Sequence, residues 1–234
     1  MHALLLPSWL PMRPSTASQL FLKSKSGAWC RVKHLLRSRP RYGVLVPEFV
    51  AADGVPFIRV NNLQGLTSCD GLAMIPRELS TQYQRTVTII NDVLVTVVGA
   101  TIGKAAVVSE GLVGANTARA IAVLRLNPQH ASSLFTTWID TPEFKQQAQL
   151  ATGADSAQPT LGMEDLANFS VRWPTDYSEE KMMTQTAFEH QLETATVHAA
   201  LNRQTTLLTE RRQALITAAI TGQIDVTTAR GVVL

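Results

Sequence analysis

A stretch of 44 residues near the C-terminus, 178–221, contains neither proline nor glycine, and this feature constrains the fold more than any other. Proline and glycine most often end helices, so their absence predicts one continuous helix. Ser178 can cap its start, Glu179 and Glu180 suit the positive end of the helix dipole, and Gly222 supplies a stop. At 1.5 Å per residue, such a helix extends roughly 65 Å.

A helix of this length needs another surface to lie against, and a second helix in a coiled coil is the simplest partner. Leucines recur every seven residues along it. The candidate pairing residues are Leu201, Leu208, Leu215 and Ala219. His198, Thr205 and Arg212 place polar groups where a strong two-stranded coil has isoleucine or valine. A partial pairing, an antiparallel pairing and a pairing with another protein therefore all stay open.

The region before this helix alternates short β-rich runs with turns. Residues 55–60, 86–90, 93–98, 104–108 and 118–126 are predicted strands, and Asn91-Asp92 is the predicted turn of a hairpin. Residues 130–139 and 142–150 have helical character, with Thr141 as N-cap and Pro142 in the first turn of the second helix. The predicted fold class is α+β: a mixed α/β domain with short strands, followed by one long C-terminal coiled-coil-type helix.

Four segments follow from this pattern. Residues 1–28 lack sustained periodicity and are predicted to be a poorly ordered N-terminal extension. Residues 29–175 form the mixed domain, 176–222 the long helix and 223–234 a tail. No apolar run approaches the roughly 20 residues that cross a bilayer, so we expect no membrane-spanning segment.

Basic residues are unevenly distributed along the chain. Residues 1–47 hold eight Lys or Arg and no Asp or Glu, whereas the remainder holds 13 basic and 18 acidic residues. An acid-free first part predicts an anionic partner such as nucleic acid. Cys30 and Cys69 lie 39 positions apart without neighbours at zinc-ligand spacing. We therefore expect no metal, no disulfide scaffold and a reducing, cytoplasmic location.

Residues 99–105, GATIGKA, resemble a phosphate-binding loop only in part. That loop needs four residues between its glycines and a Ser or Thr after the lysine, so a tight glycine turn between two strands is the better interpretation. Such a turn would still present Thr101 and Lys104 to a phosphate backbone. The His-Glu-x-x-His and Gly-x-Ser-x-Gly motifs are both missing. We predict no catalytic residues and no cofactor.

Arginine, asparagine and glutamine side chains make the bidentate contacts that read guanine and adenine edges in the major groove. Several occur at predicted strand ends or loops, where each taken singly is an ordinary turn or surface residue. The candidate base contacts are Arg59, Asn61, Asn62, Asn116, Arg119 and Gln158. The candidate phosphate contacts are Lys33, Arg39, Arg41, Thr101 and Lys104. Together with the basic first part, these residues favour binding to duplex DNA.

An ordered series of motifs resembles the specificity subunit of type I restriction–modification systems, over about residues 29–225. The series comprises Tyr42-Gly43, VPFIRVNN at 55–62, NDVLVT at 91–96, Gly99-x-x-Ile-Gly-Lys-Ala, Gly114-Ala-Asn, Trp138-Ile-x-x-x-x-Phe144, Gly153 with Gln158, Leu166-x-x-Phe169, Trp173-Pro174 and LLTERRQALITAAITGQID at 207–225. The last block is the most specific. The resemblance implies a target-recognition domain on duplex DNA, followed by a helix that packs on a second helix and docks modification subunits.

This sequence also departs from the family pattern. Family subunits usually contain two recognition domains and two helical regions, whereas one of each is found here, and the helix entry lacks the usual Glu-Gln step. The resemblance implies a half-length, non-catalytic subunit. It would pair with a second copy or another specificity fragment, and would direct a methyltransferase subunit and, through it, a restriction subunit. The alternative is a truncated fragment that binds proteins through its helix without useful DNA reading.

Overall fold

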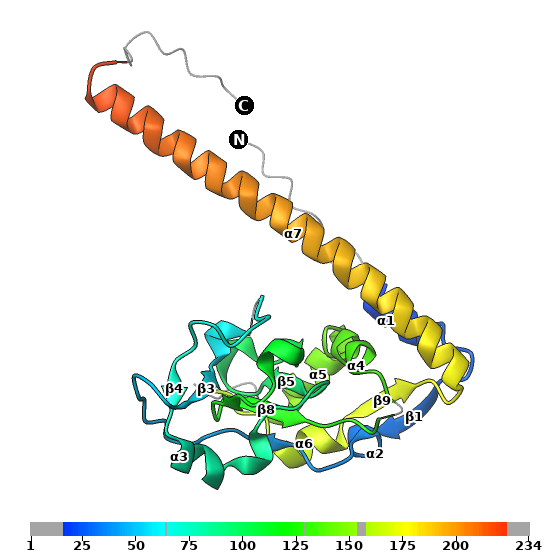
Figure 1. Ribbon diagram of the computed structural model, residues 1–234. Helices are drawn as coiled ribbons and strands as arrows, with labels where there is room; N and C mark the ends of the chain where they lie inside the picture. The colour runs from blue at the N-terminus through cyan, green and yellow to red at the C-terminus, as the bar shows by residue number, and fades with distance from the viewer. Residues whose placement is uncertain (1–15, 64, 129, 154–157, 224–234) are drawn as a thin grey trace. The chain divides into compact units, whose positions relative to one another are not determined.

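The computed structural model describes residues 16–63, 65–128, 130–153 and 158–223 (Figure 1). It divides into two units, Met1–Ala187 (unit 1) and Phe188–Leu234 (unit 2). Unit 1 combines short strands with short helices, and these are followed by one long helix, α7, Tyr177–Ile220. The predicted fold class, a mixed domain followed by a long C-terminal helix, is confirmed.

The elements of unit 1 are short. The strands are β1 Ala28–Arg31, β2 Arg41–Tyr42, β3 Val55–Ile58, β4 Met74–Ile75, β5 Val93–Thr96, β6 Ala105–Val107, β7 Asn116–Thr117, β8 Ile121–Leu124 and β9 Ser170–Trp173. The α-helices before α7 are α1 Thr16–Leu22, α2 Val32–Leu35, α3 Arg77–Gln82, α4 Ser132–Ile139, α5 Pro142–Thr152 and α6 Met163–Asn168. In the described part of the chain, 3₁₀ turns lie at Val60–Asn62, Gln84–Thr86, Gly99–Thr101 and Glu110–Leu112.

Three small sheets organise these strands. The largest is antiparallel, in the order β2-β8-β5-β6, and a second has the order β4-β3-β7, with β3 parallel to β7. The third pairs β1 with β9 antiparallel, so that the segment just before α7 is joined to the start of the domain. Figure 1 shows β5 and β8 in the interior, with α4 and α5 to one side.

Strands β5 and β8 are buried on both faces, which explains their almost wholly apolar sequences, VLVT and IAVL. Side chains alternate between the faces of a strand. Val93 and Val95 therefore pack with α4 and α5 in the larger hydrophobic cluster, whereas Leu94 packs with Ile121 and Val123 in a second cluster on the opposite face. The central sheet thus separates two cores.

The helix starts and stops follow local sequence signals. Thr141 caps α5, since its hydroxyl accepts a hydrogen bond from the Phe144 N–H, and Pro142 occupies the first turn, as predicted. The cap of α7 is Asp176 rather than Ser178: its carboxylate accepts the Ser178 N–H at 2.7 Å and the Ser178 hydroxyl at 2.6 Å. These hydrogen bonds hold the pKa of Asp176 below its ordinary value.

The end of α7 is a glycine C-cap. Gly222 has φ of +71°, and the Gln223 N–H donates to the Ala218 carbonyl at 2.9 Å, which is the pattern of a Schellman motif. The expected stop at Gly222 is confirmed. Among the described residues, no helix combines the length and apolar character that a membrane crossing requires.

Two expectations about local structure are wrong. Residues 86–90 do not form the first strand of a hairpin: the chain makes a 3₁₀ turn at Gln84–Thr86, and Thr88 is buried with its hydroxyl bonded to the Leu112 and Ala115 carbonyls. Residues 16–28 are not a loose extension. Helix α1 buries Phe21 against Trp173, and the Ser18 hydroxyl donates to Glu143 at 2.7 Å. Residues 1–15 and 224–234 of the predicted extension and tail lie outside the described residues.

Candidate nucleic-acid interface

Backbone hydrogen bonds place four connecting segments of unit 1 next to one another. The Ala118 N–H donates to the Ile58 carbonyl at 2.9 Å, and the Val97 N–H donates to the Ala120 carbonyl at 2.8 Å. The Gly99 N–H donates to the Pro159 carbonyl at 2.8 Å. We call the resulting row of segments, residues 58–62, 118–120, 97–104 and 158–160, the loop edge.

The loop edge collects most of the residues predicted to contact DNA. Five of the six candidate base contacts lie on it: Arg59, Asn61, Asn62, Arg119 and Gln158. Two candidate phosphate contacts, Thr101 and Lys104, lie there as well. The side chains of Arg59, Asn61, Arg119, Gln158 and Lys104 are exposed, and those of Asn62 and Thr101 are half-buried. Residues from positions 59 to 158 of the sequence are thus brought to one edge of the domain.

The glycine turn within the loop edge is held by its own hydrogen bonds. Gly99 and Gly103 have φ of +75° and +90°, a backbone region that favours glycine. The Thr96 hydroxyl donates to the Thr101 carbonyl, and the Lys104 N–H donates to the Thr96 hydroxyl at 3.0 Å. The turn therefore presents the Lys104 side chain from a fixed backbone, as the sequence predicts.

The segment after β3 is ordered locally. Asn62 accepts the Arg59 N–H on its side-chain oxygen at 2.9 Å, which closes the 3₁₀ turn. The Arg59 guanidinium lies 5.9 Å from the centre of the Phe49 ring, within the range of a cation–π contact. Asn62 is therefore partly committed to the turn, whereas the Arg59 guanidinium stays exposed on an aromatic support.

Asn116 is not a base contact. It is completely buried, and its side chain joins three parts of the chain. Its oxygen accepts the Thr86 hydroxyl at 2.8 Å, and its amide nitrogen donates to the Ser80 hydroxyl at 3.1 Å and the Tyr83 carbonyl at 3.4 Å. Every polar atom of this side chain is used internally, so we exclude it from the interface.

Several basic residues of the first part lie on two other parts of unit 1, outside the segments of the loop edge. The Lys33 ammonium donates to the Asn168 side chain at 2.9 Å, and Arg31 donates to the Asn168 carbonyl at 2.7 Å, so these cations fasten α6 and β9 to the start of the domain. Arg41 lies on β2 opposite Val123, and Arg39 is exposed just before it. Lys33 is therefore the weakest of the candidate phosphate contacts.

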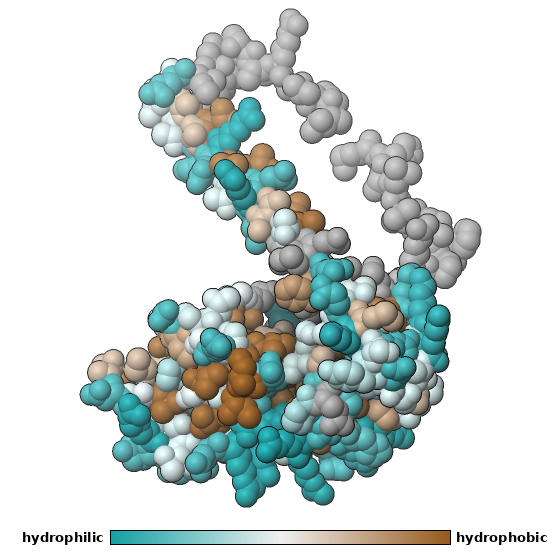
Figure 2. All heavy atoms as spheres, turned by 45° about the vertical axis from the view of Figure 1, so that its right-hand side comes forward, coloured by the Kyte–Doolittle hydropathy of each residue, from teal (hydrophilic) through white to brown (hydrophobic). Residues whose placement is uncertain are grey.

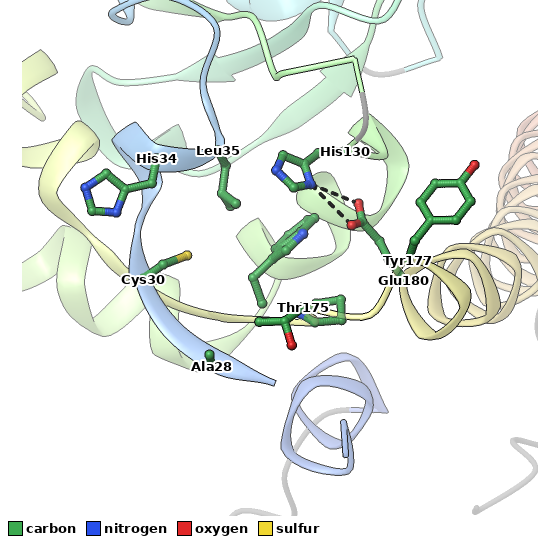
Figure 3. A pocket seen from close by; sticks show the side chains of 10 residues that line it. Ala28, Cys30, His34, Leu35, His130, Thr175, Tyr177 and Glu180 are labelled. Atoms are coloured by element: carbon green, nitrogen blue, oxygen red, sulfur yellow. Dashed lines mark hydrogen bonds and ion pairs between the residues drawn. The ribbon is translucent and has the colours of Figure 1, made fainter. Parts of the chain in front are cut away.

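The start of α7, which belongs to unit 1, is held to the rest of that unit by two carboxylates for which the sequence predicts only a capping role. Glu180 is 6% exposed and lies opposite His130, with Nδ1 to Oε2 at 3.2 Å (Figure 3). It also accepts the Ala131 N–H at 3.0 Å. Both residues line a pocket of about 460 Å³ that includes Cys30 and His34. Glu180 thus connects α7 to the start of α4.

Glu179 makes the second connection. Its carboxylate accepts the Lys25 N–H at 2.6 Å and the Ser26 N–H at 2.8 Å, and the Ser26 hydroxyl also donates to it. The Ser26 hydroxyl and amide, followed by the Lys25 amide, hold the pKa of Glu179 below its ordinary value. The segment that follows α1 is therefore tied to the first turn of α7.

Unit 2 exposes the leucines predicted to pair. Leu201, Leu208 and Leu215 are 52%, 65% and 50% exposed, and Ala219 is half-buried. Figure 2 shows hydrophobic and hydrophilic side chains interspersed along this part of the helix. The Thr205 hydroxyl donates to the Leu201 carbonyl at 2.9 Å, so its polar group is satisfied within the helix. The side chain of His198 lies outside the described residues.

No family model matches the chain. In sequence it is 33% identical over 138 residues to the EcoBI type I restriction enzyme specificity subunit of Escherichia coli. That match covers 57% of this chain and 28% of the relative. The chain therefore spans well under half the length of the curated relative it matches.

Solved structures share the fold. One match is a chain from a structural study of the complex assembly and conformational transition of the type I R-M system. It has a TM-score of 0.59 at 18% identity, and the match covers 83% of this chain and 46% of that one. The HsdS subunit of Thermoanaerobacter tengcongensis has a TM-score of 0.54 at 18% identity, covering 86% of this chain and 46% of that one. The type I S subunit of M. genitalium has a TM-score of 0.53 at 11% identity, with 81% and 45% covered.

Proposed function

We propose that this chain, a relative of type I restriction–modification specificity subunits in sequence and fold, reads the sequence of duplex DNA through the loop edge. Arg59, Arg119 and Gln158 would contact base edges, and Lys104 would contact a phosphate. The chain itself would be non-catalytic. Methylation and cleavage would belong to a methyltransferase subunit and, through it, a restriction subunit.

The observation that carries this proposal is the assembly of the loop edge itself. Arginine, asparagine and glutamine residues from three distant segments become neighbours through backbone hydrogen bonds that also include the glycine turn, and the side chains of Arg59, Asn61, Arg119 and Gln158 stay exposed. These are the side chains that read base edges in the major groove. A surface that served only protein contacts would not require this collection of bidentate hydrogen-bonding groups.

Binding of the purified full chain, alone and with a type I methyltransferase subunit, to a pool of random duplexes tests the proposal. We expect enrichment of one defined sequence. Arg119→Ala should relax the preference at one position of that sequence, at a cost of about 1–3 kcal/mol in discrimination. Lys104→Ala should weaken binding to all duplexes alike and flatten the salt dependence by about one unit.

A suitable control is Lys145→Ala, which removes an exposed cation of α5, an element outside the loop edge. It should leave both the preferred sequence and the salt dependence unchanged. If no duplex sequence is enriched with or without the methyltransferase subunit, the reading function is wrong. Retained binding to that subunit would then favour the alternative, a protein-interaction fragment.

We also propose that the exposed leucine stripe of unit 2 packs against a second helix, either in another copy of this chain or in another specificity fragment. The exposed fractions of Leu201, Leu208 and Leu215 carry this proposal, since three large apolar side chains repeat every seven residues on one face. Two copies related by a two-fold axis would then read a two-part site, with the helix setting its gap.

The double variant Leu208→Glu/Leu215→Glu should prevent this pairing, because it places charges in the apolar seam. Sedimentation equilibrium of the full chain should then show a monomer where the unaltered chain is a dimer. The matched control is Thr206→Glu/Gln213→Glu, which adds the same charge at exposed positions facing away from the leucines. A monomeric unaltered chain that also fails to pair with another specificity fragment would rule out this model.

A further inference from the structure

A second feature of unit 1 is a hollow of about 600 Å³ formed by β2, the start of α6 and the segment from the end of α3 through the following 3₁₀ turn. Figure 1 shows α3 and α6 on the same side of the domain. The residues that line the hollow include Arg41, Tyr42, Gln82, Gln84, Arg85 and Met163. This hollow is largely polar and has an arginine on each of two walls.

The charge of the hollow is wholly positive. Arg41 and Arg85 line it, and no aspartate or glutamate does. Both side chains are exposed, and within the described part of the chain neither guanidinium has an acidic partner. Other arginines are used structurally: Arg125 pairs with Asp92 at 3.1 Å, and Arg172 donates to the Ser24 carbonyl at 3.0 Å. The hollow therefore holds two uncommitted guanidinium groups.

The remaining lining supplies hydrogen-bonding groups on firm supports. The amides of Gln82 and Gln84 are exposed at the hollow. Beneath this wall, buried Asn116 bonds to Ser80, Tyr83 and Thr86 and so fixes the turn that carries Arg85. On the other wall, the Tyr42 hydroxyl donates to the Leu161 carbonyl at 3.0 Å. Rigid walls reduce the entropy lost when an anion binds.

The hollow is continuous with the loop edge. Met163, in its lining, follows Gln158 by five residues, and the intervening Leu161 N–H donates to the Val97 carbonyl at 2.8 Å. From Tyr42 in the lining, the chain runs directly to Val44, whose carbonyl accepts the Arg119 N–H at 2.9 Å. Both walls thus lead to the residues proposed to read bases.

We propose that this hollow binds a phosphodiester of the DNA backbone beside the sequence read by the loop edge, with Arg41 and Arg85 as its anion-binding groups. Guanidinium groups match phosphate oxygens in planar, bidentate geometry. The inference rests on the proposed DNA-reading function and adds to it a phosphate site and a residue, Arg85, which lies just before a predicted strand and which the sequence does not mark as a contact.

The test is the double variant Arg41→Gln/Arg85→Gln in the full chain, with fluorescence anisotropy on the enriched duplex and on an unrelated duplex over a range of salt concentrations. Glutamine keeps hydrogen-bonding groups and removes the charge. We expect binding to both duplexes to weaken by about tenfold or more, with the salt dependence flattened by about one unit and the preferred sequence unchanged. Arg41→Lys/Arg85→Lys should restore the salt dependence but only part of the affinity.

The charge-matched control is Lys145→Ala/Lys181→Ala, which removes two exposed cations elsewhere on unit 1 and should bind like the unaltered chain. Equal DNA binding by the glutamine variant and the unaltered chain would overturn this inference and leave the reading function intact. Failure of the unaltered chain to bind any duplex would instead refute the reading function. The glutamine variant could instead lose binding to inorganic phosphate or to a nucleotide while it binds duplex DNA like the unaltered chain. That result would assign the hollow to a free anion and overturn the DNA assignment.

Discussion

Replacing Phe144 by alanine is expected to lower the free energy of unfolding by about 3–5 kcal/mol. The Phe144 ring is completely buried and meets Trp138 edge-on at 5.2 Å and Phe169 at 5.5 Å between ring centres. It also lies beneath the glycine turn, because a Cβ on Gly103 would come within 3.2 Å of it. The variant would leave a cavity that this aromatic cluster cannot fill.

Urea denaturation followed by circular dichroism measures this change. The control is Leu150→Ala on the same helix, where the side chain is 77% exposed and the expected change is within about 0.5 kcal/mol. Since Phe144 supports the turn that carries Lys104, a folded Phe144→Leu variant should also bind DNA more weakly. Equal stabilities for the two alanine variants would show that the aromatic cluster is not packed as described.

Asn116→Ala should cost about 2–4 kcal/mol of stability, whereas Arg119→Ala, three residues later, should cost less than about 0.5 kcal/mol. The asparagine side chain bonds to the Ser80 and Thr86 hydroxyls inside the protein. Its removal takes this hydrogen bond from both buried groups, and the Thr86 hydroxyl keeps the Tyr83 carbonyl as acceptor. The Arg119 side chain is exposed, and its backbone N–H donates to the Val44 carbonyl.

Thermal unfolding and DNA selection on the same two variants separate the roles. Asn116→Ala should lower the melting temperature and leave the preferred DNA sequence unchanged in the fraction that folds. Arg119→Ala should leave the melting temperature unchanged and alter the preferred DNA sequence. A stable Asn116→Ala protein with altered sequence preference would return Asn116 to the set of base contacts and contradict its structural role.

Local signals in the sequence predicted the long helix and its end. A run without proline or glycine, followed by Gly222, predicts a helix and its end from adjacent residues alone. In the structure, α7 ends within two residues of that glycine. The Thr141-Pro142 start of α5 is equally local. The ordered motifs predicted a resemblance to type I specificity subunits, which the comparisons confirm. The prediction of a hairpin around Asn91-Asp92 was wrong because the Thr88 hydroxyl bonds to carbonyls more than twenty residues away, and residues 86–90 do not form its first strand.

Local patterns in the amino-acid sequence are enough to predict the fold class, the long helix and the types of side chain available to contact DNA. Which of these side chains reach solvent follows from the packing of distant segments. Asn116 and Arg119 are near neighbours with similar sequence surroundings, yet one is buried by residues 30 to 36 positions away. The same long-range packing brings Arg85 and Arg41 to one hollow and joins Glu179 to Ser26. Burial depends on contacts between distant segments, and no local pattern records them.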